Sequence, residues 1–374
     1  MARRNTDELK KWLRKNKLTT QDSLKYLGLT ITLNNTWTKH TEHILKKIRN
    51  KHDSLKLRGL QWKYLKPLTN INLIKKILIP IITYGAEIMT LNKTNKEQIN
   101  KKIARIYKDT LDLDSFTPTD WILWEIDQQK IETIILERKL NYWSKILTQP
   151  NDTIQQKILK YNKSLFTTTI IEETNKITVT STEESENKEQ IINGIQNPKN
   201  LPKKYTWKTM TKQMIETNRN NETWLKQTTP NQYKYYDIKQ HNGIDTDLFN
   251  VNQNEMALLN TTLHLRAQTI NIPSDIHPKT YNKTCKLCNK KTCDLEHLTF
   301  ECEETKEERT YLNEALSHLL EKDITKLNSK NDKDKINSIL SLSLTNDKSL
   351  NITILKAYCL FIETIEYPKP EKKN

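Results

Sequence analysis

Glycine is scarce in this chain, because only five of its 374 residues are glycine. Nucleotide-binding loops of the P-loop and Rossmann kinds need several closely spaced glycines, so the composition excludes them as a central feature. No apolar run of about 18 residues or more occurs, and the start of the chain is polar after Arg3 and Arg4. We therefore expect neither a membrane-spanning helix nor a secretory signal, and we expect an intracellular protein.

Cysteine is also rare, and three of the five cysteines fall in one short pattern, Cys285-x2-Cys288-x8-His297-x4-Cys302. In a reducing compartment, closely spaced cysteines serve as metal ligands more often than as disulfides. Zn²⁺ takes four thiolate and imidazole ligands in a tetrahedron, and this is the spacing of a zinc knuckle. The pattern therefore predicts a Zn²⁺ site at these four residues, with Cys293 as a competing candidate ligand. The alternative is four unrelated side chains in a polar loop.

Acidic residues surround the pattern and could balance the charge of the metal or accept a hydrogen bond from the ring of His297. They are Asp294, Glu296, Glu301, Glu303 and Glu304.

The positive charge is unevenly distributed. The whole chain has 61 Lys and Arg against 45 Asp and Glu, a formal charge of +16, whereas the segment Met1–Lys108 alone has 25 basic and 7 acidic residues. A concentrated basic field is typical of a surface that neutralises nucleic-acid phosphates. The candidate nucleic-acid-binding residues lie on two predicted basic helices and are Lys39, Lys46, Lys47, Arg49, Lys51, Lys101, Lys102 and Arg105. An ordinary solvated helix surface is the alternative.

Hydrophobic periodicity predicts a mostly α fold. Residues 25–33 alternate apolar and polar side chains and end at Asn34-Asn35, which predicts a strand entering a hairpin. Pro80 should kink or split the helix that contains it, and Tyr84 and Gly85 beyond it are expected to have a packing role. The helices are expected at about 38–58, 70–90, 96–111, 121–147, 206–218, 255–269, 305–320 and 352–365.

Changes in composition suggest four parts of the chain. Residues 1–150 form a basic helical domain, and residues 151–200 form a connector with an acidic low-complexity linker. The linker prediction rests on six glutamates and few large apolar residues between Glu172 and Pro198. Residues 201–320 form a helical domain that carries the zinc knuckle. Residues 321–374 form a polar segment, a terminal helix and a disordered tail.

Two groups of motifs resemble the C-terminal half of the reverse transcriptase polyprotein of non-LTR (LINE-type) retrotransposons. The first group resembles the passage from the end of the polymerase palm through the thumb, and consists of Tyr26-Leu27-Gly28, Trp37-Thr38-Lys39-His40, Ile44 and Pro80-x3-Tyr84-Gly85-Ala86-Glu87. The second resembles the Cys-Cys-His-Cys segment that ends such polyproteins, and consists of Trp207, Trp224, Tyr233, Tyr235, Leu263-x-Leu265-Arg266, Cys285-x2-Cys288, Glu296-His297-Leu298, Cys302 and Arg309. The resemblance covers about Leu24 to Arg309 and is loose between about 150 and 255. It implies a thumb-like role for residues 1–150.

The chain departs from that family in its catalytic residues. Such polymerases bind two Mg²⁺ ions with palm aspartates, including an adjacent Asp-Asp pair, and this sequence has no adjacent Asp-Asp pair. The nearest approximations, Asp112 with Asp114 and Asp245 with Asp247, are expected to be helix-end and loop carboxylates facing water. We therefore expect no catalytic residue here, and polymerase activity is uncertain.

The resemblance implies a nuclear protein that binds RNA or DNA during target-primed reverse transcription. The thumb-like part would hold the template–primer duplex by its backbone, and the knuckle would engage template RNA or target DNA. Two alternatives remain. One is a domesticated protein–protein adaptor stapled by zinc, and the other is a non-catalytic subunit that acts with a separate palm-containing polymerase chain.

Overall fold

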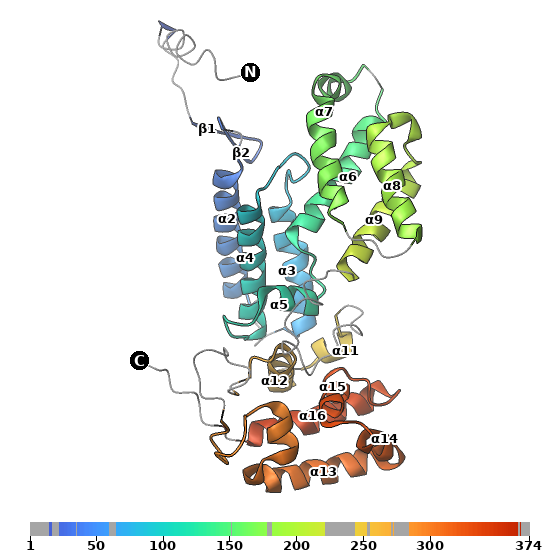
Figure 1. Ribbon diagram of the computed structural model, residues 1–374. Coiled ribbons are helices and arrows are strands. Elements are labelled where there is room, and N and C mark those ends of the chain that lie inside the picture. Colours follow the sequence, from blue (N-terminus) through green and yellow to red (C-terminus); the bar gives the residue numbers. More distant parts are fainter. Residues whose placement is uncertain are drawn as a thin grey trace.

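The computed structural model describes residues 15–16, 22–34, 36–59, 65–150, 152–177, 182–220, 244–252, 255–270, 272, 284–365 and 367. Within these residues the elements are helices and one two-stranded antiparallel sheet (Figure 1), which confirms the mostly α fold with a short β-hairpin. No helix in this part of the chain is long and apolar enough to cross a membrane. Residues 1–14 and 17–21, the aromatic residues Trp224, Tyr233 and Tyr235, and residues 368–374 of the C-terminal tail lie outside the described residues.

The hairpin consists of β1 (Ser23–Tyr26) and β2 (Leu29–Thr32), with Tyr26 opposite Leu29. Its turn therefore lies inside the segment whose alternation predicts a single strand. Leu27 and Gly28 both have positive φ angles, 45° and 83°, and this is the geometry that closes a two-residue hairpin. Glycine adopts such an angle without a steric penalty, so Gly28 makes the turn feasible.

Helices α2 (Thr38–Leu57), α3 (Pro67–Ile82) and α4 (Lys93–Leu111) pack against one another beneath the hairpin (Figure 1). Each buries one apolar stripe, and Ile48, Ile74 and Ile103 are nearly inaccessible. Helix α3 begins with Pro67, where the missing N–H has no helical partner in any case. It ends at Ile82, two residues after Pro80, whereas the sequence predicts a helix to residue 90 that Pro80 kinks or splits.

The turn after α3 supports the hairpin. Gly85 has a φ of 71°, and a Cβ atom at this position would lie 2.7 Å from Cδ2 of Leu29. The hydroxyl of Tyr84 donates a hydrogen bond of 2.9 Å to the carbonyl oxygen of Leu27. Tyr84 and Gly85 thus have the packing role that the sequence indicates.

Helices α5 (Thr119–Glu125) and α6 (Ile131–Leu147) form the helix pair predicted over 121–147. The second half of α6 packs with α7 (Ile154–Asn175), α8 (Thr182–Gln196) and α9 (Lys204–Asn220) around a separate small core (Figure 1). Its buried residues are Leu136, Leu140, Trp143, Ile146, Ile170, Ile177, Ile191, Ile195, Trp207, Met210, Met214 and Ile215.

The predicted acidic linker is therefore wrong, because most of it is helix α8 and the end of α7. Ile191 and Ile195 are fully buried and stand four residues apart on one side of α8. Glu173 is not a linker residue either, because its carboxylate forms ion pairs with Lys96 at 3.4 Å and with Lys139 at 3.0 Å. A short apolar stripe is enough to hold an otherwise acidic helix against a neighbour.

The C-terminal part contains α11 (Thr246–Phe249), α12 (Met256–Ala267), α13 (Lys306–Leu320), α14 (Ile324–Asn328), α15 (Asp332–Leu340) and α16 (Lys348–Thr364). The terminal helix is confirmed as α16. The segment before it, which is polar in composition, contains two further helices, α14 and α15, which bury Leu327, Ile336 and Leu340. These few apolar residues face inward, and the many Lys, Asn and Asp residues around them face solvent.

One apolar core joins this part to the first three helices, so the predicted separation between residues 1–150 and 201–320 is not a packing boundary. A buried ion pair crosses the junction. The guanidinium of Arg266 lies 2.5 Å from the carboxylate of Glu125 and donates a further hydrogen bond of 2.9 Å to the carbonyl oxygen of Leu340. Both charged side chains are almost fully buried, so each depends on the other for stabilisation.

Candidate metal centre

A tight turn brings Cys285 and Cys288 together. The N–H of Cys285 donates to the carbonyl oxygen of Lys291 at 2.7 Å, and the N–H of Asn289 donates to the carbonyl oxygen of Cys285 at 2.8 Å. Asn289 has a φ of 57°, a left-handed angle that asparagine tolerates better than most residues. An isolated bridge between Thr284 and Thr292 closes the base of the loop.

A single wide helical turn supplies the other two side chains. The carboxylate of Asp294 accepts a hydrogen bond of 2.8 Å from the backbone N–H of His297 and so fixes the start of the turn. Residues His297–Glu301 are π-helical, and the N–H of Cys302 donates to the carbonyl oxygen of His297, five residues earlier, at 2.7 Å. This wide turn returns Cys302 to the His297 side of the loop.

The four predicted ligands converge. One ligand atom from each of Cys285, Cys288, His297 and Cys302 lies within 4.8 Å of all the others. The sulfurs of Cys285 and Cys302 are 3.9 Å apart, and the sulfur of Cys288 is 3.3 Å from Nε2 of His297. All the cysteines are free thiols, and only Cys288 of the four ligands is more than slightly exposed. The four side chains are close enough to hold a metal ion.

The environment favours a thiolate at one ligand and opposes it at another. Burial acts to raise the pKa of Cys288. Hydrogen bonds from the Lys290 backbone and from His297 outweigh this effect and lower the pKa of Cys288 to about 6. Burial and the neighbouring Cys285 raise the pKa of Cys302 to about 12. A cation among these sulfurs would stabilise all the thiolates together, so metal binding should release protons.

Other residues of the loop support the ligands. Nδ1 of His297 lies 3.5 Å from a carboxylate oxygen of Glu301, but it has no hydrogen-bond partner among the described residues, so the expected hydrogen bond to an acid is not formed. Glu303 instead pairs with Lys290 at 2.5 Å on the surface. The guanidinium of Arg309 donates to the carbonyl oxygens of Phe300 and Cys302 and so fastens the end of the loop, a role that spacing alone did not indicate. Cys293 is buried, but it does not belong to the converging group.

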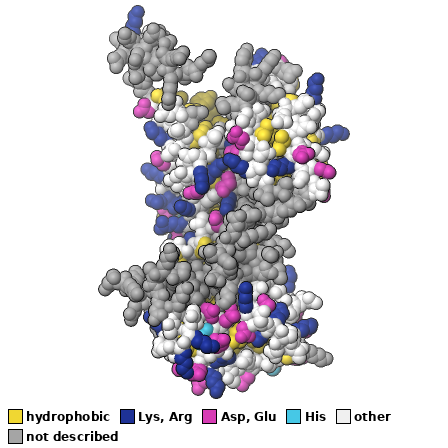
Figure 2. Space-filling view, in the orientation of Figure 1, with side chains coloured by type: hydrophobic (Ala, Val, Ile, Leu, Met, Phe, Trp, Pro, Cys, Tyr) yellow, Lys and Arg dark blue, Asp and Glu magenta, His cyan; other side chains and the backbone are white. Residues whose placement is uncertain are grey.

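The candidate nucleic-acid-binding residues occupy a different surface, on the adjacent helices α2 and α4. Lys51 and Lys102 are half-buried, and the other six candidates are exposed. Burial is the largest effect that lowers the pKa of Lys102, and the charges of Arg49 and Arg105 lower this pKa further. These three cations, which come from α2 and α4, therefore lie near one another. Figure 2 shows Lys and Arg side chains on the side of the molecule where α2 lies in Figure 1. Asp53 and Asp109 lie close enough to Lys102 to offset part of this charge.

The structure does not bring the basic residues and the metal ligands into one site. The metal loop packs with the C-terminal helices: Thr299 hydrogen-bonds Tyr358 of α16 at 3.1 Å, and the N–H of Lys286 donates to the hydroxyl of Tyr367 at 3.0 Å. Lys108, also on α4, does not belong to this surface, because it is buried and donates to the carbonyl oxygen of Ser115 at 3.1 Å.

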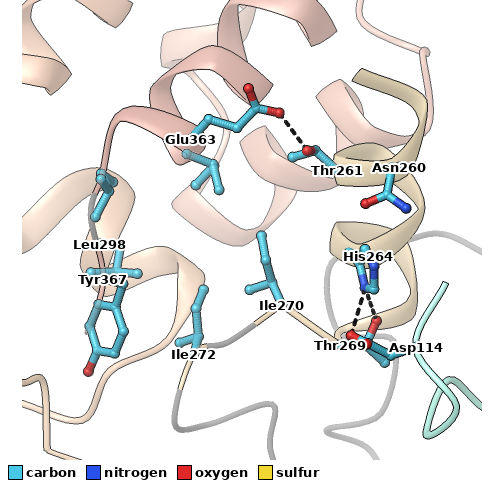
Figure 3. Close-up of a pocket in the computed structure, with 12 residues that line it drawn as sticks. Asp114, Asn260, Thr261, His264, Thr269, Ile270, Ile272, Leu298, Glu363 and Tyr367 are labelled. Atoms are coloured by element: carbon cyan, nitrogen blue, oxygen red, sulfur yellow. Dashed lines mark hydrogen bonds and ion pairs between the residues drawn. The ribbon is translucent and has the colours of Figure 1, made fainter. Parts of the chain in front are cut away.

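The two Asp-x-Asp pairs have structural surroundings. Asp112 ends α4 in a left-handed conformation, with a φ of 56°. Asp245 caps α11 by accepting from the N–H of Leu248 at 3.1 Å and lies 3.8 Å from the guanidinium of Arg266. Asp247 pairs with Lys348 at 3.6 Å. Three of the four thus serve helix ends or ion pairs, and the fourth, Asp114, is exposed and lies 4.0 Å from Nδ1 of His264 (Figure 3).

Comparisons of the chain with known protein families, with curated proteins and with solved structures found no match.

Proposed function

We propose that Cys285, Cys288, His297 and Cys302 hold one structural Zn²⁺. The convergence of three sulfurs and one imidazole nitrogen within 4.8 Å carries this proposal. Zn–S bonds of about 2.3 Å would place two sulfurs of a tetrahedron roughly 3.8 Å apart. The separation of 3.9 Å between Cys285 and Cys302 agrees with that value. Four protein ligands would leave no open coordination position, so the ion would stabilise the loop and would not activate a substrate.

We further propose that the protein binds nucleic acid through α2 and α4, as a thumb and zinc-knuckle portion of a non-LTR retrotransposon reverse transcriptase that lacks the palm. The resemblance of the motifs motivates the family, and the arrangement of the basic residues supports the activity. Positive side chains from two adjacent helices can follow a phosphate backbone without reading base sequence. The chain would then position template RNA or DNA rather than act on it.

Reversing the charge of part of this surface tests the proposal. We expect Lys46, Lys47, Arg49 and Lys51 changed together to glutamate to weaken binding to RNA and DNA of every sequence. The slope of log affinity against log salt should flatten by roughly 0.7 to 0.9 for each phosphate that the variant no longer neutralises. Binding would be measured by fluorescence anisotropy over a series of salt concentrations.

A matched variant changes four exposed lysines to glutamate, namely Lys203, which directly precedes α9, and Lys204, Lys208 and Lys212 in the first half of α9. It alters the net charge by the same amount on another surface, so its effect should be small. Equal losses of affinity in the two variants would mean that only the total charge matters and would remove the proposed surface.

The hairpin favours a second candidate function, in which the protein is a subunit that works with a separate polymerase chain. Leu24, Tyr26, Leu27 and Leu33 are each more than half exposed, and Ile31 is 40% exposed. A two-stranded hairpin with an apolar outer surface is marginally stable by itself. A palm-containing chain should therefore co-purify with the protein, and Leu24→Lys with Ile31→Lys should prevent this. Leu57→Lys, a change at an 89% exposed leucine, should have no effect. Loss of co-purification in both would exclude the hairpin as the interface.

A further inference from the structure

The β-hairpin lies over the first turn of α2 and is held there by contacts from two sides (Figure 1). On one side, Leu29 is buried against Gly85, and the hydroxyl of Tyr84 donates to the backbone of the hairpin turn. On the other side, the backbone N–H of Thr30 in β2 donates a hydrogen bond of 3.2 Å to Nδ1 of His40 in α2. A two-stranded hairpin is marginally stable by itself, so its position depends on contacts of this kind.

The hydrogen bond from Thr30 fixes the protonation state of His40. A backbone N–H can only donate, so Nδ1 is the unprotonated acceptor and the ring proton is on Nε2. His40 is 2% exposed, and its Nε2 is buried with no hydrogen-bond partner among the described residues. The ring of Trp37 lies edge-on to that of His40, 5.8 Å away, and offers no acceptor. The neutral ring therefore fits this site through one hydrogen bond.

A second proton on the ring does not fit the same arrangement. It would place an N–H at Nδ1, 3.2 Å from the N–H of Thr30, so that two donors would face each other. Both ring nitrogens would then be donors without an acceptor, and the positive charge would be buried away from water. This cost disappears when the hairpin leaves α2, because the ring then reaches solvent. Protonation of His40 and release of the hairpin are therefore coupled.

The neighbouring charges do not oppose this coupling. Burial is the largest cause that lowers the pKa of His40 below its ordinary value of 6.5, and the charge of His43 lowers it further. Strand β2 has no titratable side chain. The titratable groups on β1 and in the turn after α3 are Lys25, Tyr26, Tyr84 and Glu87. None of these groups, and none on α4, contributes to the shift. Because the docked state has the lower pKa, docking is strongest above about pH 6.5 and weakens as the pH falls below it.

We propose that the contact between His40 and Thr30 is a pH-sensitive switch that releases the β-hairpin from α2 in mildly acidic solution. At neutral pH the ring accepts from Thr30 and the hairpin stays docked. Protonation breaks this hydrogen bond, and the hairpin detaches while α2, α3 and α4 keep their packing. The switch is independent of the proposed zinc and nucleic-acid functions, and it does not require a partner chain.

Amide hydrogen exchange of the full-length protein at about pH 7.5 and about pH 5.5, corrected for intrinsic rates, tests the proposal. We expect the protection of residues 23–32 to fall several-fold at the lower pH, whereas protection in α4 should not change. The limit is about tenfold, because a released histidine with a pKa of 6.5 gains no more than that over this range. A loss of less than about twofold in the hairpin, or an equal loss in α4, would overturn the proposal.

Variants assign the effect to one ring. His40→Asn places an amide oxygen near the position of Nδ1, so it keeps an acceptor for Thr30 that does not titrate. It should keep the hairpin docked at both pH values. His43→Asn is the matched control, because His43 is an exposed histidine three residues later on the same helix, and it should behave like the wild-type protein. Persistent pH dependence in His40→Asn, or its loss in His43→Asn, would exclude His40 as the switch.

A second measurement decides the matter if asparagine does not hold the hairpin at either pH. The histidine ring signal that His40→Asn removes from the nuclear magnetic resonance spectrum identifies His40 in the wild-type protein. We expect this signal to titrate below pH 6.5, over the same range in which the hairpin loses protection. Titration of His40 without loss of protection in the hairpin would contradict the proposed coupling.

Discussion

At the scale of single residues, the converging ligands are positioned by backbone hydrogen bonds as much as by their own chemistry. The turn at Asn289 and the wide turn that ends at Cys302 place two pairs of side chains opposite each other. A fifth cysteine in the same loop, Cys293, is equally buried but is excluded from the group. Substitution of Cys288 can therefore test the assigned ligand set, and substitution of Cys293 in the same loop can serve as its control.

We expect Cys288→Ser to lose most of the bound zinc and Cys293→Ser to retain it. Serine in place of Cys288 removes a thiolate from the shell, whereas Cys293 contributes no ligand atom. Zinc per chain would be measured by mass spectrometry after gel filtration. Because structural zinc supplies folding free energy, on the order of 10 kcal/mol in small fingers, chelation should also accelerate amide exchange in residues 284–305. Equal zinc in both variants would contradict the assigned ligand set.

At the scale of secondary-structure elements, α8 shows how little apolar surface a packed helix needs. Ile191 and Ile195 are fully buried, Gly194 lies close to Trp207, and Glu183, Glu186 and Glu189 are exposed. A methyl group at Gly194 would come within 3.2 Å of Trp207, so the small residue permits close approach.

We expect Ile191→Ala to lower the free energy of unfolding by about 2 to 5 kcal/mol, because it leaves a cavity in a filled core. Ile154→Ala makes the same chemical change at a side chain that is 71% exposed, and it should cost no more than about 0.5 kcal/mol. Urea denaturation followed by circular dichroism measures both. Equal urea midpoints for the two variants would mean that Ile191 does not lie in a packed core. Residues 172–198 would then be the linker that their composition suggests.

The same contrast explains which elements the sequence could predict. Helices α2, α4, α12, α13 and α16 have repeated apolar side chains at helical spacing, so their predicted positions are close to those observed. Helices α8 and α15 have only a few buried residues among many polar ones, and their stability comes from packing against other helices, α8 against α7 and α9, and α15 against α16 and α12. The metal ligands were predictable because their spacing is local. The packing of the metal loop against α16 was not predictable, because Thr299 and Tyr358 are brought together only by the tertiary fold.

At the scale of the whole molecule, one core connects the first helices with the C-terminal ones, and the second core is built on the end of α6 (Figure 1). Glu125 and Arg266, 141 residues apart, form the buried ion pair at the junction. The proposed metal loop and the proposed nucleic-acid surface therefore belong to one packed body, although they do not share a site. Zinc would hold one end of that body while α2 and α4 contact the nucleic acid.

We expect this chain by itself not to extend a primer on any RNA or DNA template. Two-metal phosphoryl transfer needs carboxylates that converge on ions about 4 Å apart. In the described part of the chain, the one group of side chains arranged to hold a metal consists of three cysteines and a histidine. Asp112 stands at a helix end, Asp245 caps α11 beside Arg266, and Asp247 pairs with Lys348.

Primer extension with Mg²⁺ and then with Mn²⁺ measures this directly, with Asp112→Ala and Asp245→Ala prepared in parallel. Extension by the wild-type protein that Asp245→Ala abolishes would show that catalysis resides at a site we assign to structure. Asp112→Ala is the comparison, because its exposed carboxylate caps no helix start and faces no cation at hydrogen-bonding distance among the described residues. Extension that begins only after a palm-containing chain is added would instead support the two-chain assembly, in which this protein positions the duplex and its partner supplies the metals.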